Sequence, residues 1–286
     1  MSHSVKEIAG YAPGVKENVS MMTIEEGEVE HRLDLQKFWN IAPGSRILEI
    51  GCGQGTTTTV LGAIVGPDGH IDAVDPGPPD YGSPFTLSQA QSHISTTAIG
   101  KRITWHNDDP IGFLKKNPDL KWDYAIFAHC LWYFDSKDEV SRTLAAVKGR
   151  ADKLLVAEYA MKATEKAALP HVLAALTRAS LEAHNKESEA NIRCLLGPQS
   201  IKELAAGAGW TLEGESEVVP AEPLQDGHWE VSEVKANSFV TEVDKYIKDE
   251  RVNAMIKSSR EALLAAIAAA EGKKMRTMDV WVSTFN

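Results

Sequence analysis

The sequence has few cysteines and no dense cluster of basic residues. Its three cysteines, Cys52, Cys130 and Cys194, are odd in number and widely spread, which argues against a disulfide framework and against a zinc site. The formal net charge is -10, from 30 Lys and Arg against 40 Asp and Glu, so a phosphate backbone is a poor partner. These absences predict a reduced, intracellular globular protein that does not bind nucleic acid.

Long apolar segments are absent as well. The longest strongly apolar run, ALLAAIAAA near residue 265, falls well short of the roughly 20 residues that a membrane span needs. The N-terminus, MSHSVKEIAG, lacks the apolar core of a signal peptide. We therefore expect no membrane span and a cytoplasmic location. The sequence leaves the oligomeric state open, a homodimer included.

Short apolar strands alternate with helical segments from residue 46 to residue 160. The expected strands cover residues 46–50, 70–75, 102–106, 122–128 and 153–159. The expected helices between them cover residues 56–65, 86–99, 111–116 and 137–148. This alternation predicts a parallel sheet with helices on both faces, which binds its ligand at the carboxyl ends of the strands.

The last third of the chain has a different pattern. Residues 163–187 and 229–271 are rich in Ala, Glu and Lys and are predicted to be mostly helical, whereas WTLEGESEVV and MRTMDVWVSTF are predicted strands. The opening GYAPGVKENV has little periodicity and is predicted to be a flexible arm. We expect an N-terminal arm and helix over residues 1–45, a nucleotide-binding core over 46–160, and the rest of the sheet with a helical cap over 161–286.

The segment RILEIGCGQGTTTTVLG places Gly51, Gly53 and Gly55 at alternate positions between a strand and a helix. Glycine lets the backbone turn tightly and lets a ligand approach it, and this corner is a common nucleotide site. The dinucleotide fingerprint would need a glycine where Thr56 stands, and no G-K-[ST] follows. Glu49 precedes the first glycine by two positions, so the motif is acidic-x-G-x-G-x-G.

That motif resembles the first signature of class I S-adenosylmethionine (SAM)-dependent methyltransferases. HIDAVDPG, ITWHNDDP and WDYAIFAHCLWYF resemble the next three signatures and follow in the family's order. EHRLDLQKFWNIAPGSRILEIGCGQG, DYGSPFTLSQAQSHI and HCLWYF are similar to a small methyltransferase-like group described as similar to cyclopropane-fatty-acid synthases. The resemblance implies an α/β fold, with a Rossmann-like seven-stranded, mostly parallel sheet, helices on both faces and a helical cap.

The resemblance also implies SAM as cofactor and roles for particular residues. Glu49 and the three glycines belong to the cofactor site, and the carboxylate suits a ligand that carries an ammonium and a sulfonium group. Asp75 would accept the ribose hydroxyls, although a turn or helix-cap role is the alternative for an isolated Asp. The adenine edge would be read by a polar residue after the third strand, and the candidates are Asn107, Asp108 and Asp109.

His129 follows the apolar strand YAIFA and is the candidate catalytic residue beside the methyl group, as well as a cofactor neighbour. Its usual pKa suits a general base, but a histidine that only positions the cofactor fits the same place. We favour positioning at this point, because no carboxylate in the sequence visibly orients the ring. Arg32, on the predicted helix EEGEVEHRLDLQKFW, is either a contact of the cofactor's carboxylate or a solvated or capping arginine.

Residues of the acceptor pocket are predicted after His129 and in the cap. The candidates are Trp132, Tyr133, Asn191, Arg193, His228 and Trp229. Ordinary core or structural roles are the alternative for each. The remaining histidines show no metal-ligand spacing, so no metal is expected. The expected function is a SAM-dependent methyltransferase acting on a small molecule; the alternatives are SAM-dependent modification of a lipid, such as cyclopropanation, and a non-catalytic SAM-binding protein.

Overall fold

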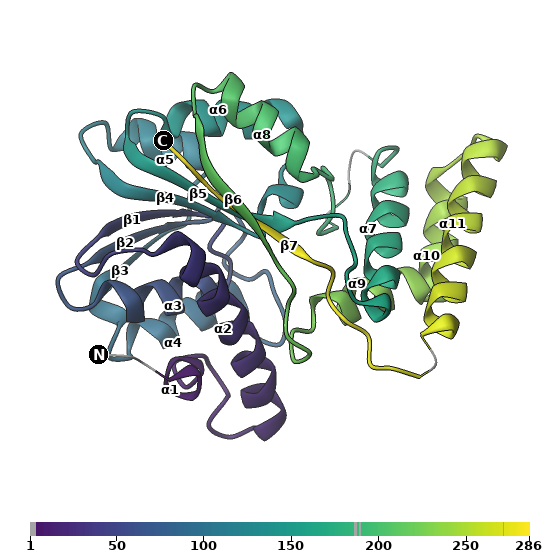
Figure 1. Ribbon diagram of the computed structural model, residues 1–286, viewed down its shortest axis with the longest axis horizontal. Coiled ribbons are helices and arrows are strands. Elements are labelled where there is room, and N and C mark those ends of the chain that lie inside the picture. The colour runs from purple at the N-terminus through teal and green to yellow at the C-terminus, as the bar shows by residue number, and fades with distance from the viewer. Residues whose placement is uncertain (1–3, 186–187, 189, 271) are drawn as a thin grey trace.

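A seven-stranded sheet forms the centre of the protein, with the strand order β3-β2-β1-β4-β5-β7-β6 (Figure 1). The computed structural model describes residues 4–185, 188, 190–270 and 272–286. Strand β7 runs antiparallel to both of its neighbours, β5 and β6, and the other pairings are parallel. The predicted Rossmann-like, mostly parallel sheet is confirmed.

The strands and helices alternate through the core as predicted. The strands are β1 (Arg46–Ile50), β2 (His70–Val74), β3 (Ile103–His106), β4 (Trp122–Ala128), β5 (Ala151–Tyr159), β6 (Leu212–Val218) and β7 (Val280–Phe285). The helices that cover the sheet are α2 (Val19–Trp39), α3 (Thr56–Val65), α4 (Leu87–Ser95), α5 (Pro110–Lys116), α6 (Lys137–Val147) and α8 (Pro198–Gly207).

The faces of the sheet are covered by different helices. Helices α2, α3 and α4 lie on one side and α5, α6 and α8 on the other (Figure 1). Side chains of the central strands, such as Ile47, Leu48 and Phe127, are fully buried between these layers. Helix α4 is shorter than predicted, because Thr86 caps its first turn and the chain leaves the helix after Ser95.

The cap is a helical layer at one end of the molecule. It consists of α7 (Leu169–Glu182), α9 (Asp226–Lys235), α10 (Asn237–Tyr246) and α11 (Glu250–Ala269), and α7 lies beside α11 (Figure 1). The cap has an apolar core of its own, which includes Phe239, Ile256 and Leu263. No described helix is both long and apolar enough to cross a membrane.

The N-terminal segment differs from the predicted flexible arm. Helix α1 (Val5–Ala9) buries Ile8 and Ala9 in a cluster with residues of α2 and α3. In the loop that follows, Ala12 and Val15 are also buried. The arm is therefore packed against the core, and its few apolar side chains lacked the periodicity that would have revealed this.

Candidate cofactor and acceptor sites

All three glycines of the corner after β1 have positive φ, which is 74° at Gly51, 53° at Gly53 and 97° at Gly55. A Cβ on Gly51 would lie 2.5 Å from the Cβ of Cys130, and one on Gly55 would lie 2.6 Å from the ring of Trp105. A Cβ on Gly53 would meet no described atom within 4 Å. The protein's own packing thus requires the first and third glycines, whereas the second faces open space.

Asp75 joins the glycine corner to the loop after β2. Its carboxylate accepts hydrogen bonds from the backbone N–H of Gly53 and of Gly77, both at 2.8 Å. Both oxygens are thereby held in place at the carboxyl end of the sheet. A fixed carboxylate at this position is preorganised to accept further donors from a ligand.

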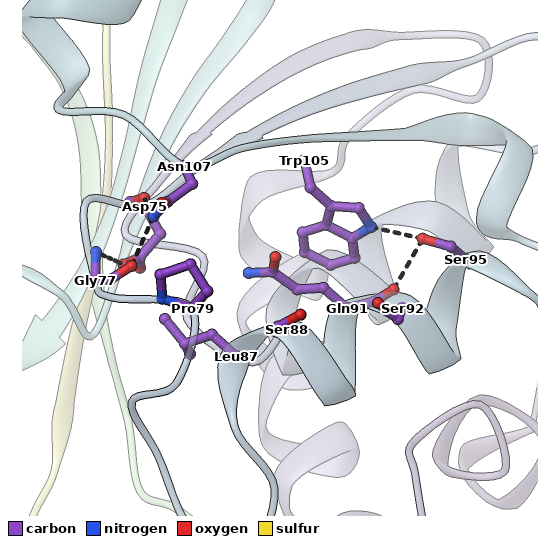
Figure 2. A pocket seen from close by; sticks show the side chains of 10 residues that line it. All are labelled: Asp75, Gly77, Pro79, Leu87, Ser88, Gln91, Ser92, Ser95, Trp105 and Asn107. Carbon is purple, nitrogen blue, oxygen red and sulfur yellow. Dashed lines mark hydrogen bonds between the residues drawn. The ribbon is translucent and has the colours of Figure 1, made fainter.

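A pocket of about 280 Å³ opens beside Asp75 (Figure 2). Asn107 lines it, and its side-chain amide donates to the carbonyl oxygens of Asp75 at 3.1 Å and Gly77 at 2.6 Å. The other lining residues are Gly77, Pro79, Leu87, Ser88, Gln91, Ser92, Ser95 and Trp105. The wall is therefore shared between the ends of β2 and β3 and helix α4.

Helix α4 supplies a polar wall that the sequence analysis missed. Ser88, Gln91, Ser92 and Ser95 follow the three- and four-residue spacing of one helix face, and all four line the pocket. The amide of Gln91 also donates to the carbonyl of Gly53 at 2.9 Å. That spacing was the available signal for these residues.

Of the three candidates after β3, only Asn107 lines the pocket. Asp109 is the N-cap of α5, where its side chain accepts from the backbone N–H of Gly112 at 2.9 Å. Asp108 forms an ion pair with Lys116. The carboxylates after Asn107 are engaged in local structure of α5.

Glu49 is buried beneath the glycine corner, with 1% of its surface exposed. The hydroxyl of Thr58 donates to its carboxylate at 2.6 Å, and the carboxylate makes no ion pair with any residue in the described part of the chain. Burial raises the pKa of Glu49 to about 8. A cationic ligand group would favour the ionised form, so this carboxyl suits an ammonium.

His129 lies directly after β4 with a positive φ of 53°, which is uncommon outside glycine. Its Nε2 is 2.9 Å from Nε2 of His31 on α2, and its ring centroid is 4.7 Å from that of Tyr159. The carboxylate of Glu158 lies 3.7 Å from Nδ1 of His129. A carboxylate does stand beside this ring, contrary to the expectation; it comes from the neighbouring strand, so proximity in sequence did not reveal it.

Buried polar side chains continue from His129 toward the cap. The ring centroids of Tyr159 and His171 are 5.0 Å apart, and Nδ1 of His171 accepts from the backbone N–H of Met278. Burial lowers the pKa of His171 to about 4, so this imidazole is neutral near pH 7. We call this group, with two carboxylates described below, the cap cluster: His31, His129, Tyr159, His171, Glu28 and Asp226.

Arg32, the candidate contact of the cofactor's carboxylate, forms an ion pair with Glu28 on the same helix, α2. The side chain of Arg32 is only 11% exposed, so it is not the solvated arginine of the alternative interpretation. Its charge stands next to the cap cluster.

The predicted acceptor-pocket residues take three kinds of position. Trp132 is buried, and its ring centroid lies 4.9 Å from that of Tyr159, with the two ring planes tilted by 47°. Its indole N–H donates to the carbonyl of Leu196. Asn191 lies 3.4 Å from both the Tyr81 hydroxyl and the Glu230 carboxylate. Trp132 therefore contacts the cap cluster through Tyr159, and Asn191 contacts Glu230 on α9, the helix that begins with Asp226.

The other four predicted residues face outward. Tyr133 is 42% and Trp229 47% exposed, and His228 is exposed on the same turn of α9. Arg193 forms an exposed ion pair with Asp135 at 2.6 Å. The structure does not bring these side chains together with His129 in an enclosed site.

Comparison with known proteins places the chain in a family. The family model described as "Methyltransferase domain" matches residues 25–214. The methyltransferase phomM of Diaporthe leptostromiformis is 30% identical over 281 residues, which cover 82% of this chain and 71% of that protein. The chain belongs to the methyltransferase domain family, which confirms the predicted enzyme class and its cofactor, SAM.

Solved structures agree with this assignment. The cyclopropane-fatty-acyl-phospholipid synthase-like protein of Lactobacillus casei ATCC 334 is 28% identical, with a TM-score of 0.86 over 100% of both chains. The [4+2]-cyclase SpnF shares the fold, with a TM-score of 0.53, 13% identity and coverage of 90% of this chain and 79% of that one. The predicted similarity to cyclopropane synthase-like proteins is thereby confirmed.

Proposed function

We propose that the protein transfers the methyl group of SAM to a small-molecule acceptor enclosed by the helical cap. SAM would lie along the carboxyl ends of β1, β2 and β3. Asp75 would hold the ribose, Asn107 would face the adenine side of the pocket, and Glu49 would pair with the ammonium group. His129 would stand beside the reacting methyl.

The donor groups at this edge fit such a ligand. The open space at Gly53 leaves its backbone accessible, whereas the pocket beside Asp75 has a helix face of hydroxyl and amide groups along one wall. The buried Glu49 has a hydroxyl partner but forms no ion pair with a residue in the described part of the chain. This last feature fits a ligand with a positive charge and no phosphate.

SAM supplies an activated methyl carbon, so the chain has to bind, align and exclude water. Alignment of two reactants can contribute about 7–11 kcal/mol to a displacement of this kind. The glycine corner and Asp75 fix one partner through backbone groups. Helices α7 and α9 of the cap lie beside the sheet and would enclose the acceptor (Figure 1). The imidazoles of His129 and His31, which contact each other, would accept a proton from it.

The observation that carries the proposal is the Asp75 carboxylate, fixed by Gly53 and Gly77 at the mouth of a pocket that Asn107 lines. Titration calorimetry with SAM and with its demethylated product, S-adenosylhomocysteine (SAH), tests it. We expect dissociation constants of about 1 µM to 1 mM, the usual range for enzyme ligands. Binding of NAD in this range without any response to either sulfur nucleoside would contradict the proposal.

Modification of an unsaturated lipid is the second candidate, favoured by the similarity to the cyclopropane-fatty-acyl-phospholipid synthase-like protein of Lactobacillus casei. The buried imidazoles and carboxylates of the cap cluster are poor surroundings for an alkyl chain, because each unpaired polar group loses its hydration. Incubation with SAM and unsaturated phospholipid vesicles, followed by mass spectrometry of the lipids, distinguishes the two.

A further inference from the structure

The cap cluster joins five elements that are far apart in the sequence. His31 and Glu28 come from α2, His129 follows β4, Tyr159 ends β5, and His171 lies on α7. Asp226 is the first residue of α9, and the loop before α9 packs on α2, where a Cβ on Gly27 would lie 2.7 Å from Pro223. The cluster therefore occupies the junction of the catalytic edge and the cap.

Several buried atoms of the cluster have no hydrogen-bond partner among the described residues. Two are carboxylate oxygens, Oε1 of Glu28 and Oδ2 of Asp226. Three are imidazole nitrogens, Nδ1 of His31, Nδ1 of His129 and Nε2 of His171. A buried polar atom without a partner costs about 1–3 kcal/mol, so such a concentration in one place indicates that a ligand supplies the missing partners.

The titratable groups around the cluster are mainly acidic. Glu25, Glu28, Asp226 and Glu230 act on one another electrostatically, and Arg32 is the cation paired with Glu28. Burial raises the pKa of Glu28 to about 8 and those of Glu25 and Glu230 to about 7. A cation placed among these carboxyls would favour their ionised forms and gain a charge-assisted hydrogen bond from each contact.

We infer that the cap cluster is the acceptor site of the methyltransferase and that the acceptor presents a protonated amine. The inference rests on the proposed function. Glu28 and Asp226 receive the N–H groups of the ammonium, because their free oxygens are acceptors. A carboxylate acceptor would face mainly acidic side chains and an arginine, Arg32, that is already paired with Glu28, and a neutral hydroxyl would not gain the charge-assisted hydrogen bonds that an ammonium gains.

A protonated amine must lose a proton before it can react, and the pair of His129 and His31 can accept that proton. If Nε2–H of His129 donates to Nε2 of His31, Nδ1 of His129 is free to accept a proton, with Glu158 3.7 Å away to stabilise the imidazolium. The amine then uses its lone pair to form the N–C bond, the S–C bond of SAM breaks, and its electron pair remains on sulfur. One proton moves to His129, and the product is the methylated ammonium.

Matched probes test the ligand class without knowledge of the natural acceptor. The probes are 2-phenylethylamine, 2-phenylethanol and 3-phenylpropionate, together with hexylamine, hexanol and hexanoate, titrated by calorimetry into the SAH-saturated protein. In at least one series we expect the amine to bind about tenfold or more tightly than its alcohol and its acid. Equal affinities, a preference for the acid, or no binding by either amine would overturn the inference.

Variants locate the site. Glu28→Gln and Asp226→Asn should each weaken amine binding about tenfold, whereas Glu30→Gln, which removes an exposed charge from the same helix, should leave it unchanged. All three variants should retain SAH binding, so failure of the inference remains distinguishable from failure of the proposed function. Unchanged amine affinity in both Glu28→Gln and Asp226→Asn would place the amine elsewhere and overturn the inference.

Discussion

The proposed cofactor pocket and the cap cluster lie at the same edge of the sheet but differ in how their polar groups are satisfied. In the cofactor pocket, Asp75 and Asn107 are bonded to backbone groups of adjacent loops. In the cap cluster, Glu28, His171 and Asp226 each leave a buried atom without a partner in the described structure. The first site is complete in its own bonding, whereas the second depends on what binds there.

The origin of the two sites explains this difference. The cofactor pocket and glycine corner come from one stretch, residues 49–107, in which each strand end is followed directly by the loop it supports. The cap cluster draws on segments from α2 to α9. Local segments can be optimised for their own hydrogen bonds, but a junction of distant elements that receives a ligand must keep some groups free for it.

The largest expected effect concerns His129 and tests whether the cap cluster takes part in the reaction. With Glu158 beside the ring, we now expect His129 to act as the proton acceptor rather than only to position the cofactor. With any acceptor that the enzyme methylates, His129→Gln should lose about 10²–10⁴-fold in rate, and the acidic limb of the pH profile should disappear. SAH affinity, measured by calorimetry, serves as control. An unaltered pH profile with a small loss of rate would return His129 to a positioning role.

The next effect separates the glycines that the fold needs from the one that the ligand needs. Gly51→Ala should lower the free energy of unfolding by about 2–5 kcal/mol. The new Cβ would clash with Cys130, and the alanine backbone would be strained by the positive φ at this position. Gly44→Ala, also at positive φ but in open space, should cost only the strain, about 1–2 kcal/mol. Urea denaturation measures both. Equal losses would show that packing at Gly51 is unimportant.

Gly53 should behave in the opposite way to Gly51. Gly53→Val should cost the strain of a left-handed backbone, about 1–2 kcal/mol, without a packing clash, since its side chain enters open space, and it should abolish SAH binding. Calorimetry on the variant, with urea denaturation as the check that it is folded, tests this. Normal binding would refute the idea that the ligand approaches the backbone here.

Asp75 and Asp109 provide a matched pair of carboxylates. Asp75→Ala should weaken SAH binding by about 2–4 kcal/mol, through loss of charge-assisted hydrogen bonds and of the brace between Gly53 and Gly77. Asp109→Ala should instead lower stability by about 1 kcal/mol, because it removes the N-cap of α5, and should keep the affinity. Reversed outcomes would move the ribose site toward α5.

The smallest effect is a pH dependence of stability that originates mainly in the buried carboxyls. The pKa of Glu28 and of Glu49 is about 8 in the folded protein against 4.5 for the unperturbed group. Between these values the folded state holds protons that the unfolded state has lost, so the free energy of unfolding falls as pH rises. The lowered pKa of His31 and of His171 opposes this trend near pH 6.5, but these two groups are outweighed by the four carboxyls whose pKa is raised to about 7 or 8.

Differential scanning fluorimetry from pH 6.5 to pH 8 measures the trend in the ligand-free protein. The melting temperature should fall by a few degrees, since about 2–4 °C corresponds to 1 kcal/mol in a chain of about this size. Glu28→Gln should reduce the slope and Glu30→Gln should not. A rise in melting temperature over this range would mean that the carboxyls are already ionised in the folded state.

The sequence alone determined most of the elements and the outline of the proposed cofactor site. Strands β1 and β4 and helix α3 begin and end at the predicted residues, because their apolar runs and flanking glycines are local signals. Asp75 and Asn107, two of the predicted cofactor residues, line one pocket because they directly follow strands whose ends meet at one edge. Asp108 and Asp109 have the same position in sequence, and only the start of α5 separates them from Asn107.

Only the tertiary structure decided the surroundings of the reacting groups. His31 and His129 are 98 positions apart, and they meet because α2 packs beside the end of β4. Glu158 reaches His129 through the pairing of β4 with β5, and Asp226 approaches Glu28 because the cap folds back onto α2. Periodicity reports which face of an element is buried, but it carries no record of which distant element covers that face. The order of the strands and the placement of the cap therefore set the chemistry of the acceptor site.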